Sequence, residues 1–355
     1  MEKQPHVTII VLNYNGLRKL GNILKSCIKS ILETNYDNFT VIFTDNGSTD
    51  NSVQFIQTEF PSERKLKILP LPRNYGYAGG NNRAAMHAKM INPETKYLAF
   101  VNNDVIVKPD WLRKLVNFMG RRRYIGALQP LILYPDGRIQ AAGWIIGKCG
   151  SPFPLYNGVT LEELNEVLGT REYIFPFYVY GACFITPSKI FYETGGFDEN
   201  FFLYCEELDY CWRLWKLGYA SACLLNTHVY HYESLTIGKY SSIEGYYNTR
   251  NTIWTMVKNE EDLVRGLLHV LLFILINIHI KCLRLKLPLK YKLSVLRGML
   301  SAFKELRRAL YKRPLNRSLF NRYLILKDMY HDELLILPMR SLADRLIKRW
   351  LLKRR

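Results

Sequence analysis

Short apolar runs separated by longer amphipathic segments mark the first hundred residues of the chain. Four such runs, at 7–12, 39–45, 66–71 and 97–101, predict strands. The first, VTIIVL, is a continuous β-rich run, which predicts a strand buried on both faces. Residues 17–32 carry apolar side chains at helical spacing. Strands that alternate with helices in this way predict a parallel sheet with right-handed crossovers, and therefore an α/β fold.

The pattern after these strands predicts a mixture of elements. Residues 126–146 are expected to form strands with a turn at 135–137, and residues 178–191 a strand that leads into a short helix. Residues 195–219 predict a loop followed by an amphipathic helix, and residues 150–175 an irregular loop. From about residue 245 onward the pattern is mainly helical.

Polar side chains follow each of the four predicted parallel strands. Ligands of parallel sheets bind outside the carboxyl ends of the strands, so we expect these side chains to share one site. Asp45 taken alone would be read as a turn cap, and it is the coincidence of several strand ends that favours a site. The candidate ligand-binding residues are Asn13, Asn15, Asp45, Asn74, Gly76, Gly79, Asn81, Asn102 and Asp104.

Asp45 and the glycine-rich stretch 74–82 indicate a nucleotide. The carboxylate of Asp45 can accept the imide N–H of a uracil or thymine ring. Glycines let backbone approach a ligand closely, and a helix expected from about Arg83 would favour phosphate at its N-terminus. The stretch matches neither GxGxxG nor a P-loop, and the alternative is an ordinary strand-to-helix turn.

Asp104, in the run FVNNDV at 100–105, is a candidate ligand for a divalent cation. Mg²⁺ typically uses one or two protein carboxylates together with substrate phosphates. Because Asn102 occupies the place of another carboxylate, we expect His231 to be the second protein ligand. The alternative is a structural histidine, and Asn103 is expected to serve only the turn.

Glu206 and Glu207 lie where the amphipathic helix within 195–219 is expected to begin. The helix dipole stabilises carboxylates at this position, which is the structural explanation. The functional explanation is a general base for a hydroxyl whose proton leaves as a C–O bond forms. Asp209 and Arg213, four residues apart, are expected to form an ion pair along the same helix.

The positive charge of the chain is concentrated at its C-terminal end. The formal net charge is +18, and residues 281–355 contain 21 Lys and Arg against five Asp and Glu, a net of +16. We therefore divide the chain into a nearly neutral domain, 1–255, and a basic helical region, 256–355. Such a block of charge is typical of proteins that bind nucleic acid or an anionic membrane surface.

A membrane surface is the favoured partner of the basic region. Residues 266–282 are apolar but interrupted by two histidines and an asparagine, so we expect an interfacial helix and not a spanning one. Residues 340–355 place Trp350 and leucines opposite basic side chains, as helices in an anionic leaflet do. A helical bundle with a solvated basic face is the alternative. No zinc spacing or nucleic-acid module is present, so nucleic acid ranks last.

Cysteine usage and the N-terminus place the protein on the cytosolic side. The seven cysteines include no CxxC pair, and an odd number does not fit a secreted disulfide framework. The first apolar run is too short for a signal peptide. Together with the basic region, this predicts the cytoplasmic face of the cell membrane, with peripheral or monotopic attachment.

The order of these motifs, from VTIIVLNYNG through TDNGSTD, NYGYAGGNN, FVNNDV and LYCEELDYCWRL to HYES and YYNTRN, resembles the family 2 glycosyltransferases of GT-A fold. The resemblance covers roughly residues 5–255 and is closest to the rhamnosyltransferase-like branch that builds surface polysaccharides. It implies a mixed, mostly parallel sheet flanked by helices. It also implies direct displacement, with inversion at the anomeric carbon.

The resemblance assigns a role to each motif. Asp45 matches the residue that reads the base, and residues 74–81 match the nucleotide loop. Asn102 and Asp104 match the DxD motif, which binds the ribose and Mg²⁺ or Mn²⁺, with Asn102 in place of its first Asp. Glu207 matches the general base, where Asp is commoner, so Glu206 remains a candidate.

The implied donor is dTDP-L-rhamnose or a UDP-sugar, and the implied acceptor is a saccharide linked to polyprenyl diphosphate. An alternative of a different class is a catalytically weak, membrane-docked scaffold that binds a nucleotide-sugar or a partner. A sugar nucleotidyltransferase should carry a glycine-rich signature with Arg and Lys near its N-terminus, which LNYNGLRKL does not show.

Overall fold

The computed structural model describes residues 4–147, 151–232, 240–260, 263–284 and 286–311. Twelve strands form in these residues, ten of them in one sheet. They are β1 (Val7–Asn13), β2 (Phe39–Asp45), β3 (Leu66–Pro70), β4 (Tyr97–Asn102), β5 (Val105–Val107), β6 (Ile125–Leu133), β7 (Ile139–Ala141), β8 (Trp144–Ile146), β9 (Pro152–Pro154), β10 (Tyr173–Ile174), β11 (Cys183–Pro187) and β12 (Ala220–His231).

Helices flank the sheet and form a separate group after β12. They are α1 (Gly16–Leu20), α2 (Asn22–Leu32), α3 (Ser52–Glu59), α4 (Gly76–Ile91), α5 (Trp111–Arg121), α6 (Leu161–Leu168), α7 (Ser188–Glu193), η1 (Glu199–Phe201), α8 (Glu206–Lys216), α9 (Ser242–Asn259), α10 (Leu263–Asn277), the π-helical η2 (Ile278–Arg284), α11 (Leu289–Lys304) and α12 (Leu306–Tyr311).

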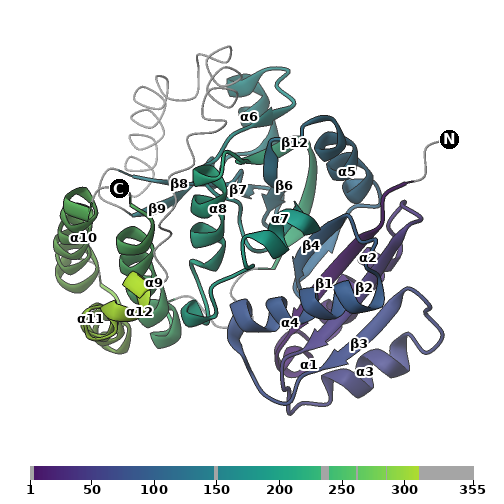
Figure 1. Ribbon diagram of the computed structural model, residues 1–355, viewed down its shortest axis with the longest axis horizontal. Coiled ribbons are helices and arrows are strands. Elements are labelled where there is room, and N and C mark those ends of the chain that lie inside the picture. The colour runs from purple at the N-terminus through teal and green to yellow at the C-terminus, as the bar shows by residue number, and fades with distance from the viewer. Residues whose placement is uncertain (1–3, 148–150, 233–239, 261–262, 285, 312–355) are drawn as a thin grey trace.

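The four predicted parallel strands are confirmed. In the sheet order β10-β12-β6-β11-β4-β1-β2-β3, strand β1 pairs in parallel with β2 and β4, and β2 with β3. β11 runs antiparallel to β4, which makes the sheet mixed. Helices α2 and α5 pack on one face and α4 and α8 on the other (Figure 1). Neighbouring residues such as Ile9 and Ile10 are therefore both buried, which explains the continuous apolar runs.

The parallel register brings the polar strand ends to one edge. Asn13 of β1 pairs with Asp45 of β2, and Leu12 pairs with Asn102 of β4. The candidate residues after these strands are therefore neighbours in space, although up to about ninety positions separate them in the chain.

Two predictions about local structure are wrong. Helix α4 begins at Gly76 and not near Arg83, so the glycine-rich stretch forms its first two turns and not a loop. Residues 150–175 are not irregular, because they contain β9, α6 and β10. Thr160 caps α6 with a reciprocal bond to Glu163, a capping box that the sequence carries but that the prediction overlooked.

The C-terminal helices are organised around α9, which runs across the predicted domain boundary at residue 255. Helices α8, α10, α11 and α12 all contact it, and α10 and α11 lie at the edge of the molecule farthest from β3 (Figure 1). In the described part of the chain, one helical stretch, Gly266–Leu283, is long and apolar enough to cross a membrane by length and composition. The amphipathic segment predicted at 340–355 lies outside the described residues.

Candidate active site

Gly181, just before β11, joins the glycine-rich segment to the candidate base. The Tyr77 hydroxyl of α4 donates to the Gly181 carbonyl at 2.7 Å, and the Gly181 N–H points to Glu207 Oε1 at 3.4 Å. A Cβ at this position would lie 3.3 Å from that carboxylate oxygen and 3.4 Å from the tyrosine hydroxyl. Glycine therefore allows α4 and α8 to converge here.

The residues on either side of Gly181 reach the other two motifs. The Ala182 carbonyl accepts the N–H of Asn102 at 2.9 Å. The ring of Tyr180 lies edge-on to that of His231, with 5.6 Å between their centroids. Segment 180–182 thus contacts the glycine-rich stretch, the end of β4, the candidate metal ligand and the candidate base.

The ends of β1 and β2 hold Asp45 in a fixed orientation. Asn13 Nδ2 donates to Asp45 Oδ1 at 3.0 Å, and the Ser48 N–H donates to Asp45 Oδ2 at 2.9 Å. Asn103 Nδ2 in turn donates to Asn13 Oδ1 at 2.8 Å. The expectation that Asn103 serves only its turn is therefore wrong, because its buried amide braces the residue that orients Asp45.

Asn15 and Asn46 support the same edge. Asn15 has a left-handed backbone, with φ 54°, and its Oδ1 accepts from the Thr49 N–H at 2.8 Å. Asn46 was not predicted. Its Nδ2 donates to Asn74 Oδ1 and to the Gly76 carbonyl, each at 3.0 Å. Its place in Asp-Asn-Gly was the available signal, since that tripeptide marks a turn whose middle side chain often bonds nearby backbone.

The glycines of α4 serve protein contacts. Gly76 has φ +72°, and a Cβ there would lie 2.1 Å from the Phe202 carbonyl oxygen. That carbonyl accepts the Tyr77 N–H at 2.6 Å, while Asn74 Oδ1 accepts the Gly76 N–H at 2.8 Å. The first amides of α4 thus have protein partners in place of the phosphate that we expected there.

The other two residues predicted on α4 also pack within the protein. A Cβ on Gly79 would lie 2.9 Å from the Cβ of Tyr75. The Asn81 side chain is buried and donates to the Tyr77 carbonyl one turn earlier, at 3.0 Å. Contact of either residue with a donor stays a prediction.

Asp104 and His231 meet where β5 and β12 pair. His231 Nε2 lies 3.2 Å from Asp104 Oδ1, and His231 Nδ1 lies 2.8 Å from Gln140 Oε1. When Nδ1 donates to the Gln140 amide oxygen, a neutral imidazole turns the lone pair of Nε2 toward the Asp104 carboxylate. Asp104 Oδ1 is a buried oxygen without a hydrogen-bond partner in the described structure. A divalent cation would satisfy both atoms, so the pair fits the expected metal site.

The pair does not make a complete metal site by itself. Within the described ranges, no group of three or more His, Cys, Asp and Glu side chains could hold a metal ion. Further ligands would have to come from water or from a donor diphosphate, as is usual for Mg²⁺ beside nucleotides.

Glu206 and Glu207 have different surroundings at the start of α8. Glu206 is 3% exposed, and its Oε2 has no hydrogen-bond partner in the described structure. Burial and the neighbouring Glu207 charge raise the pKa of Glu206 well above its ordinary value. Glu207 is partly exposed, and burial raises its pKa to about 7. Glu207 is therefore the carboxylate that can both reach a ligand and exchange a proton near neutral pH.

Helix α9 holds the loop that precedes these carboxylates. Phe202, Tyr204 and Cys205 all have positive φ, from 64° to 68°, which is strained for side chains of this size. Asn251 Nδ2 of α9 donates to the carbonyls of Phe201, Leu203 and Tyr204 at 2.8–2.9 Å. Asn251 belongs to the YYNTRN motif, but the sequence predicts no role for it, because nothing local in the chain connects it to this loop.

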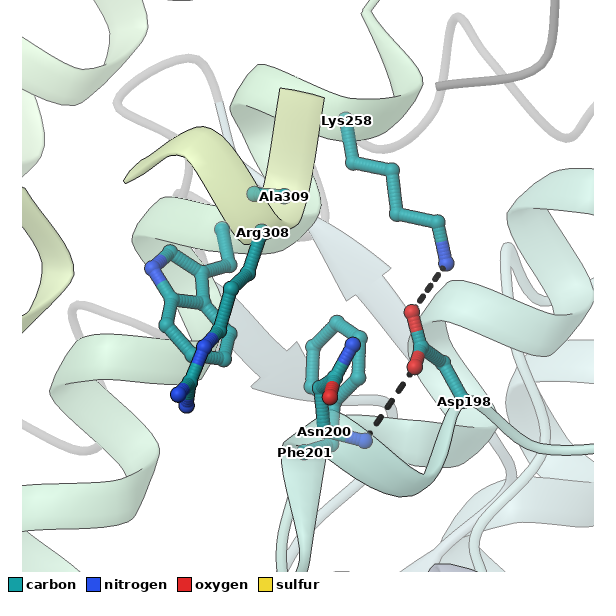
Figure 2. Close-up of a pocket in the computed structure, with 7 residues that line it drawn as sticks. Asp198, Asn200, Phe201, Lys258, Arg308 and Ala309 are labelled. Atoms are coloured by element: carbon teal, nitrogen blue, oxygen red, sulfur yellow. Dashed lines mark hydrogen bonds and ion pairs between the residues drawn. The ribbon is translucent and has the colours of Figure 1, made fainter. Parts of the chain in front are cut away.

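A buried charge network fixes α8 against α9. Lys258 Nζ lies 2.9 Å from Asp198 Oδ2 and 2.9 Å from Asp209 Oδ1 (Figure 2 shows the Asp198 contact). The predicted ion pair of Asp209 with Arg213 is confirmed at 3.0 Å. Burial alone would raise the pKa of Asp209, but the Arg213 and Lys258 charges hold it below its ordinary value.

Comparison with known proteins identifies the family. Residues 8–143 match glycosyl transferase family 2. The chain is 30% identical over 214 residues to an N-acetylglucosaminyl-diphospho-decaprenol L-rhamnosyltransferase of Mycobacterium tuberculosis, which covers 56% of this chain and 68% of that protein. It is 30% identical over 236 residues to the O-antigen biosynthesis protein RfbC of Myxococcus xanthus, which covers 65% of this chain. The chain spans only 17% of RfbC and 26% of an uncharacterized Sinorhizobium fredii relative.

Solved structures share the fold. TarS 1–349 of S. aureus in complex with UDP-GlcNAc has a TM-score of 0.55 at 16% identity, over 86% of this chain and 81% of that one. The mannosyltransferase PcManGT of Pyrobaculum calidifontis, in complex with GDP-Man and Mn²⁺, has a TM-score of 0.53 at 14% identity, over 97% and 84%. The chain therefore belongs to glycosyltransferase family 2, resembles its rhamnosyltransferases, and has the GT-A fold.

Proposed function

We propose that the protein transfers a sugar from a nucleotide-sugar to a hydroxyl of a saccharide, with inversion at the anomeric carbon. The observation that carries this proposal is segment 180–182, which contacts the glycine-rich segment, Asn102, His231 and Glu207. A direct displacement requires a nucleotide site, a group that offsets the charge of the leaving diphosphate, and a base. Residues of the types that can serve these three roles lie together at one edge of the sheet.

Glu207 is the general base of the proposed reaction. The acceptor oxygen attacks the anomeric carbon and its proton passes to the Glu207 carboxylate, while the bond to the diphosphate oxygen breaks and the nucleoside diphosphate leaves with the electron pair. A pKa of about 7 leaves Glu207 ionised and still basic near neutral pH. Burial and the Glu207 charge both raise the pKa of Glu206 and so favour its neutral form, which adds no second negative charge beside the base.

The donor-site residues have supporting roles. Asp45, oriented by Asn13 and Ser48, would accept from the base of a thymidine or uridine nucleotide. Asp104 and His231 would hold Mg²⁺ or Mn²⁺, which when bound offsets the charge of the diphosphate. The Mn²⁺ named for PcManGT and the UDP-GlcNAc named for TarS are consistent with this donor chemistry.

We further propose dTDP-L-rhamnose or a UDP-sugar as donor and a saccharide on polyprenyl diphosphate as acceptor. The support is the Mycobacterium relative, whose name describes an L-rhamnosyltransferase and a decaprenol-linked substrate. With a lipid-linked acceptor, the proposed location is the cytoplasmic face of the cell membrane. Nucleic acid is not a proposed partner.

The test is turnover by the purified full-length chain. Release of nucleoside diphosphate would be measured with dTDP-L-rhamnose, UDP-GlcNAc and GDP-mannose, with and without a short-chain polyprenyl-diphosphate saccharide. We expect acceptor-dependent release with one thymidine or uridine donor. Donor binding without release for any acceptor would favour the scaffold alternative.

A further inference from the structure

Helices α10 and α11 expose an unusual amount of apolar surface. Of the 23 large hydrophobic side chains exposed in the described structure, 14 belong to residues 264–310. They lie mainly on α10 (Val264, Leu267, Leu268, Leu271, Leu272 and Leu275) and on α11 (Leu289, Leu293, Leu296, Leu300 and Phe303). Exposed apolar side chains gathered on two helices at one edge of a folded domain indicate an interaction site (Figure 1).

Each helix also has an inner apolar face that is already occupied. In α11, Tyr291, Val295 and Met299 are buried, and Ala302 accepts a hydrogen bond from Trp254 of α9. In α10, Val270 and Phe273 are buried in the same core cluster. A helix that packs on a soluble domain needs one apolar face, so the leucines on the outer faces are not explained by the fold.

Basic side chains border the outer face of α11. Lys290, Arg297 and Lys304 are exposed and seven residues apart, so they form a stripe next to the leucines at 289, 293, 296 and 300. Residues 263–311 contain ten Lys and Arg and one acidic residue. Long basic side chains beside an apolar stripe are the arrangement of helices that lie in an anionic lipid surface.

The geometry favours helices that lie in the membrane plane. Gly266–Leu283 has the length of a membrane span, but its inner residues pack on α9. α11 is 16 residues long, about 24 Å, and carries Arg297 midway along it, so it cannot span a core of about 30 Å. Both outer faces enter lipid together only if both helices lie at the interface.

We propose that the outer faces of α10 and α11 form one docking surface for an anionic lipid bilayer, with the leucines in the acyl boundary and the basic stripe at the headgroups. The proposal deepens the membrane location given above and rests on it. It does not depend on sugar transfer, since lipid binding is measured without donor or acceptor.

The test is flotation of the full-length protein with vesicles of phosphatidylglycerol and phosphatidylcholine, or of phosphatidylcholine alone. Leu296→Glu/Leu300→Glu on α11 and Leu268→Glu/Leu272→Glu on α10 should each lower binding to anionic vesicles at least tenfold. The matched control is Met86→Glu/Met90→Glu, which places the same charge on exposed apolar positions of α4 and should bind like the parent. Far-UV circular dichroism and thermal melting check that each variant is folded.

A second variant tests the basic stripe while leaving the leucines unchanged. Lys290→Gln/Arg297→Gln/Lys304→Gln should weaken binding to anionic vesicles and reduce its dependence on salt. Unchanged binding of both leucine variants would overturn the proposal. The proposal would also be overturned if the protein bound neutral vesicles regardless of salt and only the α10 variant lost this binding. That result would indicate that α10 spans the membrane. The last measurement is sedimentation without lipid. If the protein is a dimer that the α11 substitutions dissociate while vesicle binding stays intact, the surface binds a second copy of the chain and not lipid.

Discussion

The two carboxylates at the start of α8 give the sharpest prediction. Burial raises the pKa of Glu207 to about 7, from an ordinary value of 4.5. A base must be ionised, so kcat should rise with pH through this value. At pH 6 about one tenth of the enzyme would carry the ionised base, and kcat should be about tenfold below its plateau at pH 8 and above. A surface glutamate would give a flat profile over the same range.

Substitution separates Glu207 from its neighbour. Glu207→Gln keeps the shape of the side chain but removes the proton acceptor, so kcat should fall by ~10²–10⁴ while donor affinity is retained. Burial and the Glu207 charge raise the pKa of Glu206 and favour its neutral form, which glutamine resembles, so the loss of kcat on Glu206→Gln should be much smaller. A larger loss at Glu206 than at Glu207 would move the base to Glu206. A kcat independent of pH between 5.5 and 8.5 would refute the reasoning about burial.

The same pKa shift predicts a change in stability of known sign. Because the folded state raises the pKa of Glu207, it binds this proton more tightly than the unfolded chain does. The resulting stabilisation of the folded state is complete below pH 4.5 and is lost as the pH rises to about 7. The cost of the buried charge at pH 8 is at most about 3 kcal/mol. Glu207→Gln should therefore raise the melting temperature at pH 8 but not at pH 4.5. A lower melting temperature at pH 8 would contradict this.

Three further predictions concern residues that support the site. His231→Ala should raise the Mn²⁺ concentration needed for half-maximal binding, measured by electron paramagnetic resonance of free Mn²⁺, and unchanged binding would remove His231 from the metal site. Asn251→Ala should lower kcat with little change in donor affinity, because it frees the carbonyls of the loop before α8; an effect on donor affinity alone would contradict this role. Lys258→Met should destabilise the fold by about 3–5 kcal/mol in urea unfolding, since it leaves buried Asp198 and Asp209 with less compensation, and a loss below 1 kcal/mol would refute it.

The sequence alone determined the sheet and the edge that carries the site. Continuous apolar runs bounded by polar residues define strands buried on both faces, and the carboxyl ends of such strands meet at one edge of a parallel sheet. The rule needs only the local pattern of apolar and polar residues along the chain, and it applies to parallel sheets in general. It is therefore enough to place Asn13, Asp45 and Asn102 at one edge, and the register of β1 with β2 and β4 confirms that placement.

Tertiary structure alone decided which side chains work together at that edge. The resemblance favours Glu207 but leaves Glu206 a candidate, and only packing buries Glu206 and leaves Glu207 beside Gly181. Gly76 looked suited to a ligand, yet its missing Cβ makes room for the Phe202 carbonyl. Asn251 acts on a loop nearly fifty residues earlier in the chain. Such contacts depend on how elements far apart in the chain pack together, which no local pattern of apolar and polar residues specifies.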